Sequence, residues 1–113
     1  MAIDDALAAR IRAILRQHLP ADAITEKSLF GGLAFMVRGH MCVTVSGRDG
    51  TEIMVRIGKD AHDAALCEDG VRTTIMRGRA YRGYLDLDAQ ALPRLAYWVE
   101  KALAYNRTLQ EKP

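Results

Sequence analysis

The sequence has 113 residues, of which 50% are hydrophobic and 27% charged; this is the composition of one folded domain and excludes a disordered or collagen-like chain. With 16 basic against 14 acidic residues the net charge is only +2, so binding to nucleic acid or a membrane would have to be local. No apolar run approaches the roughly 20 residues of a membrane-spanning helix, and the charged N-terminus does not resemble a secretory signal. We expect a single domain over residues 1–113 that stays in the cytoplasm, away from the membrane.

The N-terminal segment is predicted to be a helix because its apolar residues recur at spacings of three and four, which places them on one helical face: Ile3, Leu7, Ile11, Ile14 and Leu15. Asp4 or Asp5 is the expected N-cap, since a carboxylate there accepts free backbone N–H groups. Pro20 is expected to end the helix. Residues 21–28 are interpreted as a connection.

Three short strands are expected next, at 29–38, 41–46 and 51–57, because their residues are apolar or alternate with polar ones. Glycine-containing segments at 39–40 and 47–50 separate them. These segments predict tight hairpin turns, and short turns force each strand to run antiparallel to the one before it.

The second half of the sequence predicts two helices and two strands, at 61–69, 71–76, 81–87 and 92–109. Gly70 is expected to end the first of these helices, residues 77–80 to join the strands, and Pro93 to lie in the first turn of the last helix. The order helix, three strands, helix, two strands, helix predicts an α+β domain of two layers. In it an antiparallel sheet of about five strands carries the helices on one face.

Six segments in this order resemble a known family: KSLFGGLAFMV at 27–37, GHM at 39–41, MVRIG at 54–58, MRGR at 76–79, RGY at 82–84 and WVEKAL at 98–103. Over about residues 25–109 the sequence is similar to the N-terminal domain of the TfoX/Sxy competence regulators. The resemblance implies an α+β fold like that of secretion chaperones, and a non-enzymatic regulatory role through protein–protein contacts. The family's regulators of DNA-uptake genes carry a further C-terminal domain, which we do not expect in this chain.

A partner surface is expected on the sheet face turned away from the helices, through which the chain would form a homodimer or bind another protein. Helices of modest length cover one face of a five-stranded sheet, so the other face meets water or a partner. The expected surface contains residue types that are common in interfaces: Phe30, Met36, Met54, Arg56, Arg82 and Tyr84. Cys42 and Thr44 are placed on the same face. The alternative is that the last helix or the tail covers it.

A basic segment is the strongest local signal outside the resemblance. Residues 71–83 contain four arginines and no acid: Arg72, Arg77, Arg79 and Arg82. Tyr81 and Tyr84 lie close to these arginines in the sequence. Arginine can bind phosphate and tyrosine can stack on bases, so the alternative function is a nucleic-acid-binding hairpin. The simpler interpretation is a solvated rim whose arginines pair with nearby acids such as Asp60, Asp63, Glu68 and Asp69.

Metal and catalytic sites have little support in the sequence. Four potential zinc ligands lack the usual spacing, so we expect no metal or other cofactor: His40, Cys42, His62 and Cys67. Both cysteines are expected to be reduced, His40 to lie in a turn and His62 to be exposed. No nucleophile signature surrounds Ser28 or Ser46, so an enzyme of unknown reaction ranks third. Asp86 is expected on a solvated strand face, and Asp88 to lead into the last helix.

Overall fold

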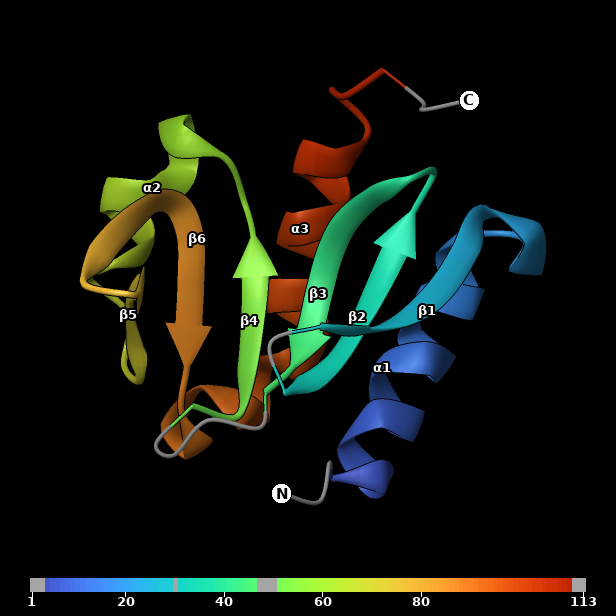
Figure 1. Cartoon of the computed structure of the whole chain (residues 1–113), viewed down its shortest axis with the longest axis horizontal. Coiled ribbons are helices and arrows are strands. Elements are labelled where there is room, and N and C mark those ends of the chain that lie inside the picture. The colour runs from blue at the N-terminus through green and yellow to red at the C-terminus, as the bar shows by residue number, and fades with distance from the viewer. Residues whose placement is uncertain (1–3, 30, 47–50, 111–113) are drawn as a thin grey trace.

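The computed structural model describes residues 4–29, 31–46 and 51–110. Within these ranges the chain forms one six-stranded antiparallel sheet, in the order β1-β2-β3-β4-β6-β5, with three α-helices and two short 3₁₀ helices (Figure 1). In chain order the elements are α1 (Asp5–His18), η1 (Ala21–Ala23), β1 (Ile24–Leu29), β2 (Gly32–Val37), β3 (His40–Val45), β4 (Ile53–Arg56), α2 (Lys59–Ala65), β5 (Val71–Met76), β6 (Arg79–Leu87), η2 (Ala89–Arg94) and α3 (Leu95–Asn106).

The elements are arranged in two layers. Helices α1 and α3 lie behind the sheet in Figure 1 and contact each other, and α2 packs against β6. The face toward the viewer carries no helix of the described residues and is called the open face below. The predicted α+β class and antiparallel sheet are therefore confirmed.

The sheet has six strands in the described residues, one more than expected, because the presumed connection contains β1 (Ile24–Leu29). β1 is an outer strand whose four central residues are exposed, so it lacks the apolar alternation of a half-buried strand. The predicted strand at 29–38 is in fact parts of two strands, since Leu29 ends β1 and pairs with Gly32 of β2.

The N-terminal helix forms as predicted. The Asp4 carboxylate accepts a hydrogen bond of 3.0 Å from the Leu7 N–H and caps α1. The helix ends at His18, two residues before Pro20. Its buried face, which includes Ile11 and Leu15, joins the core between the helices and the sheet.

Two hairpin turns differ from their predicted positions: the first lies at 38–39 instead of 39–40, and the second is shorter, at 77–78 instead of 77–80. Arg38 and Gly39 both have positive φ, of 51° and 86°, and join β2 to β3; Arg77 and Gly78, with φ of 53° and 74°, join β5 to β6. Two central residues of positive φ are the signature of a type I′ turn, whose twist matches that of the strands. The third predicted turn, at 47–50, lies outside the described residues.

Both later helices are shorter than predicted. α2 begins at Lys59 and ends at Ala65, five residues before Gly70. Pro93 lies in the 3₁₀ helix η2, and α3 begins only at Leu95, because proline cannot donate an intrahelical hydrogen bond.

The core lies between the sheet and helices α1 and α3, around the buried Trp98 and Phe35. Cys42 belongs to it, which corrects its predicted place on the open face. The register of β2 and β3 shifts by one residue, from Phe35 opposite Val43 to Met36 opposite Met41. Cys42 is the extra residue of this bulge, and a bulge redirects side chains locally. No helix of the described residues is long and apolar enough to cross a membrane.

Candidate functional site

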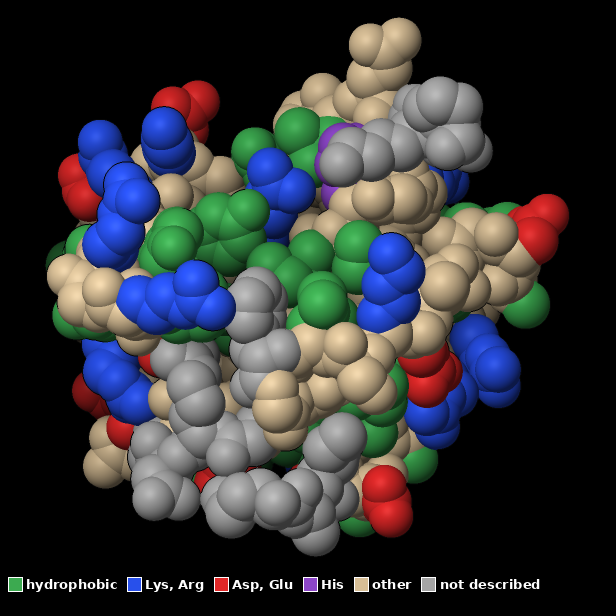
Figure 2. Space-filling model, viewed as in Figure 1, with side chains coloured by type: hydrophobic (Ala, Val, Ile, Leu, Met, Phe, Trp, Pro, Cys, Tyr) green, Lys and Arg blue, Asp and Glu red, His purple; other side chains and the backbone are tan. Residues whose placement is uncertain are grey.

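The open face carries an apolar patch over the middle of the sheet. Five side chains from four strands form it, and we call them the Met–Tyr patch: Met36, Met41, Met76, Tyr81 and Tyr84. Met36 and Met41 pair across β2 and β3. Figure 2 shows hydrophobic side chains gathered on this face with Lys and Arg around them.

A hollow of about 270 Å³ opens in the Met–Tyr patch, between Met41, Met76, Arg77, Tyr81 and Tyr84. The two tyrosine rings meet edge to face, with centroids 6.2 Å apart. Methionine side chains are flexible and polarizable and adapt to the shape of a bound group. The hollow can therefore receive an apolar side chain.

The residues predicted for a partner surface are only partly brought together. Met36, Arg56 and Tyr84 are half-buried on the open face. Met54 lies on the same face but is only 3% exposed, so it offers almost no surface to a partner. Phe30 lies outside the described residues.

The four arginines predicted as a nucleic-acid contact do not act as one group. Arg82 turns toward α2, where its Nη2 lies 3.0 Å from a carboxylate oxygen of Asp63. Arg72 lies at the far end of the β5–β6 hairpin, 3.8 Å from Asp88. Arg77 and Arg79 are exposed at the turn and form no ion pair with the described residues. The predicted pairing with nearby acids is thus confirmed for Arg82.

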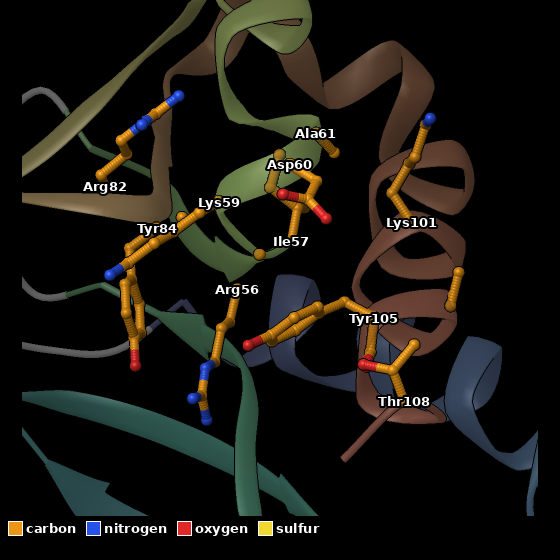
Figure 3. A pocket seen from close by; sticks show the side chains of 13 residues that line it. Arg56, Ile57, Lys59, Asp60, Ala61, Arg82, Tyr84, Lys101, Tyr105 and Thr108 are labelled. Atoms are coloured by element: carbon orange, nitrogen blue, oxygen red, sulfur yellow. The ribbon is translucent and has the colours of Figure 1, made fainter.

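A larger cavity, of about 720 Å³, opens between the N-terminal part of α2, the middle of β6 and the C-terminal half of α3. We call it the α2–α3 pocket (Figure 3). Four cationic side chains line it, Arg56, Lys59, Arg82 and Lys101, together with the carboxylate of Asp60. Three segments that are distant in the sequence supply the lining, at 56–61, 82–84 and 101–108.

Arg56 lies between two aromatic rings at the floor of this pocket. Its guanidinium carbon is 5.4 Å from the ring centroid of Tyr84 and 5.4 Å from that of Tyr105, which extends toward it from α3 (Figure 3). Cation–π contacts of this length stabilise and orient a guanidinium. Arg56 and Tyr84 also lie on the open face, so the pocket and the Met–Tyr patch adjoin.

His62 fixes α2 beside the pocket, and its predicted exposure is wrong: it is 2% exposed. The Gly83 N–H donates a hydrogen bond of 3.0 Å to Nδ1 of His62. Nδ1 therefore carries no proton, and Nε2–H donates to the Thr73 hydroxyl at 2.9 Å. Both ring nitrogens are thus used to hold the helix against β5 and β6.

Gly58, in the connection from β4 to α2, lies very close to the ring of Tyr105. Gly58 has φ 85° and ψ 160°, a conformation that is almost restricted to glycine. A Cβ at this position would lie 2.3 Å from Cδ1 of Tyr105. Only a residue without a Cβ therefore lets the Tyr105 ring approach the backbone this closely.

A buried polar cluster lies on the open face where a solvated Asp86 was predicted. Asp86 is 4% exposed and accepts hydrogen bonds from the hydroxyls of Thr74, at 2.8 Å, and Thr51, at 3.3 Å. These hydrogen bonds offset the free-energy cost of burying a carboxylate. Asp88 instead caps the 3₁₀ helix η2 by accepting from the Gln90 N–H, which confirms its predicted position before the last helix.

The histidines and cysteines considered as zinc ligands do not come together in the described part of the chain. Among residues 4–29, 31–46 and 51–110, no three His, Cys, Asp or Glu side chains form a metal-binding group. Cys42 and Cys67 are free thiols, and burial raises the pKa of Cys42 to about 12, although the nearby Arg56 opposes the shift. His40 begins β3 instead of lying in the turn, and its Nε2 is 2.6 Å from the Gln110 carbonyl oxygen.

Sequence reasoning missed much of both cavities. Met41 and Met76 border turns and show no distinctive pattern, and Lys59, Lys101 and Tyr105 belong to ordinary amphipathic stretches. The one usable signal was Gly58 between a strand and a helix, because such a glycine often marks a close approach of another group.

The sequence of the chain matches one known protein family. Residues 16–105 match the TfoX N-terminal domain family, a span that runs from the end of α1 to nearly the end of α3 and includes all described lining residues of both cavities except Thr108. Comparisons with curated proteins and with solved structures give no match. The chain therefore belongs to the TfoX N-terminal domain family.

Proposed function

We propose that this chain is a non-enzymatic regulatory domain whose open face binds a protein segment with both apolar and acidic side chains. The observation that supports this most is the hollow of about 270 Å³ bordered by two methionines, two tyrosines and Arg77. Accessible Met, Tyr and Arg side chains are the types that concentrate in protein interfaces. One apolar side chain of the partner fills the hollow and acidic neighbours meet the arginines around it.

The charges around the patch favour an acidic partner over a second copy. At the paired strand positions described for the open face, the accessible charges are cations, among them Lys27 and Arg56, whereas Asp86 is buried. A two-fold contact of this face with itself brings the same arginines together, which is unfavourable. The homodimer through this face stays a prediction, and light scattering at micromolar concentration tests it: a monomer refutes it.

Selection from a random peptide library displayed on phage tests the proposed partner chemistry. Selected peptides should combine Asp or Glu with Leu, Phe or Met, and bind at least about tenfold more weakly to Tyr84→Ala and Arg77→Glu variants. Arg10→Glu, on the exposed side of α1, is the matched charge control and should bind as the wild type does. Peptides that bind all three variants equally, or a selection without enrichment, would refute the proposal.

Nucleic-acid binding is the alternative function, supported by the exposed Arg77 and Arg79 at the β5–β6 turn. Phosphate contacts release counterions, so the affinity for single-stranded DNA would fall steeply as salt rises. Micromolar or tighter binding that disappears in the Arg77→Ala/Arg79→Ala double variant would establish this function in place of the first. Absence of binding at low salt would exclude it.

A further inference from the structure

The α2–α3 pocket is large enough, and charged enough, for a small anionic molecule. Its volume of about 720 Å³ lies within the range of roughly 300–1,000 Å³ that is typical of small-molecule sites. Four cations line it against one carboxylate, in a chain whose total net charge is only +2. Positive charge is therefore concentrated here.

Three of these cations form no ion pair with the described residues, although the Lys101 ammonium lies 5.6 Å from the centroid of the Tyr97 ring. The three are Arg56, Lys59 and Lys101, whereas Arg82 already pairs with Asp63. In Figure 3, Arg82 and Lys101 stand on opposite sides of the pocket, with Arg56 between the two tyrosine rings below. An anion that binds Arg56 or Lys59 therefore does not have to break an ion pair with the described residues.

Arg56 is held ready for a planar or tetrahedral anion. Both rings beside it restrict its side chain, at 5.4 Å each, and the Tyr105 ring is itself fixed by the backbone of Gly58. A guanidinium donates two parallel hydrogen bonds to phosphate or carboxylate oxygens, and restricting it beforehand reduces the entropy lost on binding. Phosphate carries more charge than carboxylate and matches a set of several cations better.

The carboxylate of Asp60 restricts which anionic molecules the α2–α3 pocket can bind. Its carboxylate points into the same pocket, so an anion without other groups is repelled there. A ligand with hydroxyl groups next to its phosphate donates hydrogen bonds to Asp60 and places its phosphate among the cations.

We propose that the α2–α3 pocket binds a sugar phosphate, either free or as part of a nucleoside phosphate. Arg56 and Lys59 hold the phosphate, and Asp60 accepts from the sugar hydroxyls. This site is separate from the peptide contact proposed above, although both include Tyr84.

Calorimetric titration of the full chain with four probes tests the proposal: ribose 5-phosphate, ADP, inorganic phosphate and ribose. Ribose 5-phosphate or ADP should bind at least about tenfold more tightly than inorganic phosphate or ribose, and the stronger of the two identifies the source of the sugar phosphate. Arg56→Gln and Lys59→Gln should each weaken this binding about tenfold or more, since each removes a charge-assisted contact. Arg10→Gln, on α1, should leave it unchanged.

Asp60→Asn gives an independent check that does not rest on loss of a cation. It should lower the preference for the sugar phosphate over inorganic phosphate, because the amide is a weaker acceptor for the hydroxyls and no longer repels the bare anion. Thermal melting confirms that each variant is folded. The proposal is overturned if neither sugar phosphate binds the wild type at millimolar concentration. It also fails if folded Arg56→Gln and Lys59→Gln bind as the wild type does, or if Asp60→Asn leaves the preference unchanged.

Discussion

Replacing Gly58 by alanine tests whether the backbone of the β4–α2 connection positions Tyr105. Alanine at φ 85° and ψ 160° is strained by about 1–3 kcal/mol. The added Cβ also lies 2.3 Å from the Tyr105 ring, which has to move by about 1 Å, and overpacking of this kind costs about 1–3 kcal/mol more. We expect Gly58→Ala to lower the free energy of unfolding by about 2–6 kcal/mol.

Urea unfolding followed by Trp98 fluorescence measures this loss, since Trp98 is the single tryptophan and is buried. Gly78→Ala is the control, because Gly78 also has a positive φ, of 74°, but nothing lies within 4 Å of its added Cβ. It should cost about 1 kcal/mol.

A double-mutant cycle separates the clash from the backbone strain. In a Tyr105→Ala background the ring is gone, so Gly58→Ala should cost only its strain, and the coupling energy should be about 1–3 kcal/mol. The reasoning is refuted if Gly58→Ala is as mild as Gly78→Ala, or if its cost is the same with and without the ring.

Three further predictions concern other contacts. His62→Leu should lower the free energy of unfolding in urea by about 2–4 kcal/mol, because it leaves the buried Gly83 N–H without an acceptor. Asp63→Ala on the same helix is the control and should cost less than about 1 kcal/mol. Equal effects would contradict the role of His62 in holding α2 against the sheet. A maleimide at pH 7.5 should modify Cys67 and spare Cys42 in the native protein, as read by mass spectrometry, because burial raises the pKa of Cys42 to about 12; rapid labelling of both would show that the core opens there. The hydrogen bond from Arg12 lowers the pKa of Glu26, so this pair stabilises the fold above the ordinary carboxyl pKa of about 4 and loses its effect as the pH falls through the lowered value. Glu26→Gln should thus cost less than about 1 kcal/mol at pH 7 and nothing at pH 2, and a difference that persists in acid would point to packing instead.

The sequence predicted those elements whose apolar residues follow the period of a helix or a buried strand. α1 was predicted nearly to the residue, because a capping aspartate and a proline bound its apolar stripe. β1 was missed because an outer strand with four exposed residues between Ile24 and Leu29 has no such stripe to show. The turn at Arg38 lies one residue earlier than predicted, and the turn at Arg77 is two residues shorter than predicted. At each of them an arginine has a positive φ, a conformation that is uncommon for residues other than glycine and therefore hard to predict.

The candidate site was less predictable than the fold. Each of its two cavities combines side chains from segments that are distant in the sequence, from Arg56 to Thr108 in one and from Met41 to Tyr84 in the other, so no local spacing predicts them. The burial of His62 and Asp86 was missed for the same reason, since it depends on partners such as Gly83 and Thr51 that only the folded chain supplies.

The strand order also has a consequence for how the domain folds and opens. In the described part of the chain, each pair of neighbouring strands follows directly along the sequence except β4 and β6, which join a four-stranded meander to the β5–β6 hairpin. Pairing between nearby segments closes small loops and forms early, whereas the β4–β6 ladder has to wait for a longer loop. The sheet thus has two units of sequence-adjacent strands, which meet along the β4–β6 ladder, and the lining of each cavity includes residues from both units. A ligand in either cavity links the two units, so binding should slow the exchange of backbone amide hydrogens along β4 and β6 more than in the outlying hairpins.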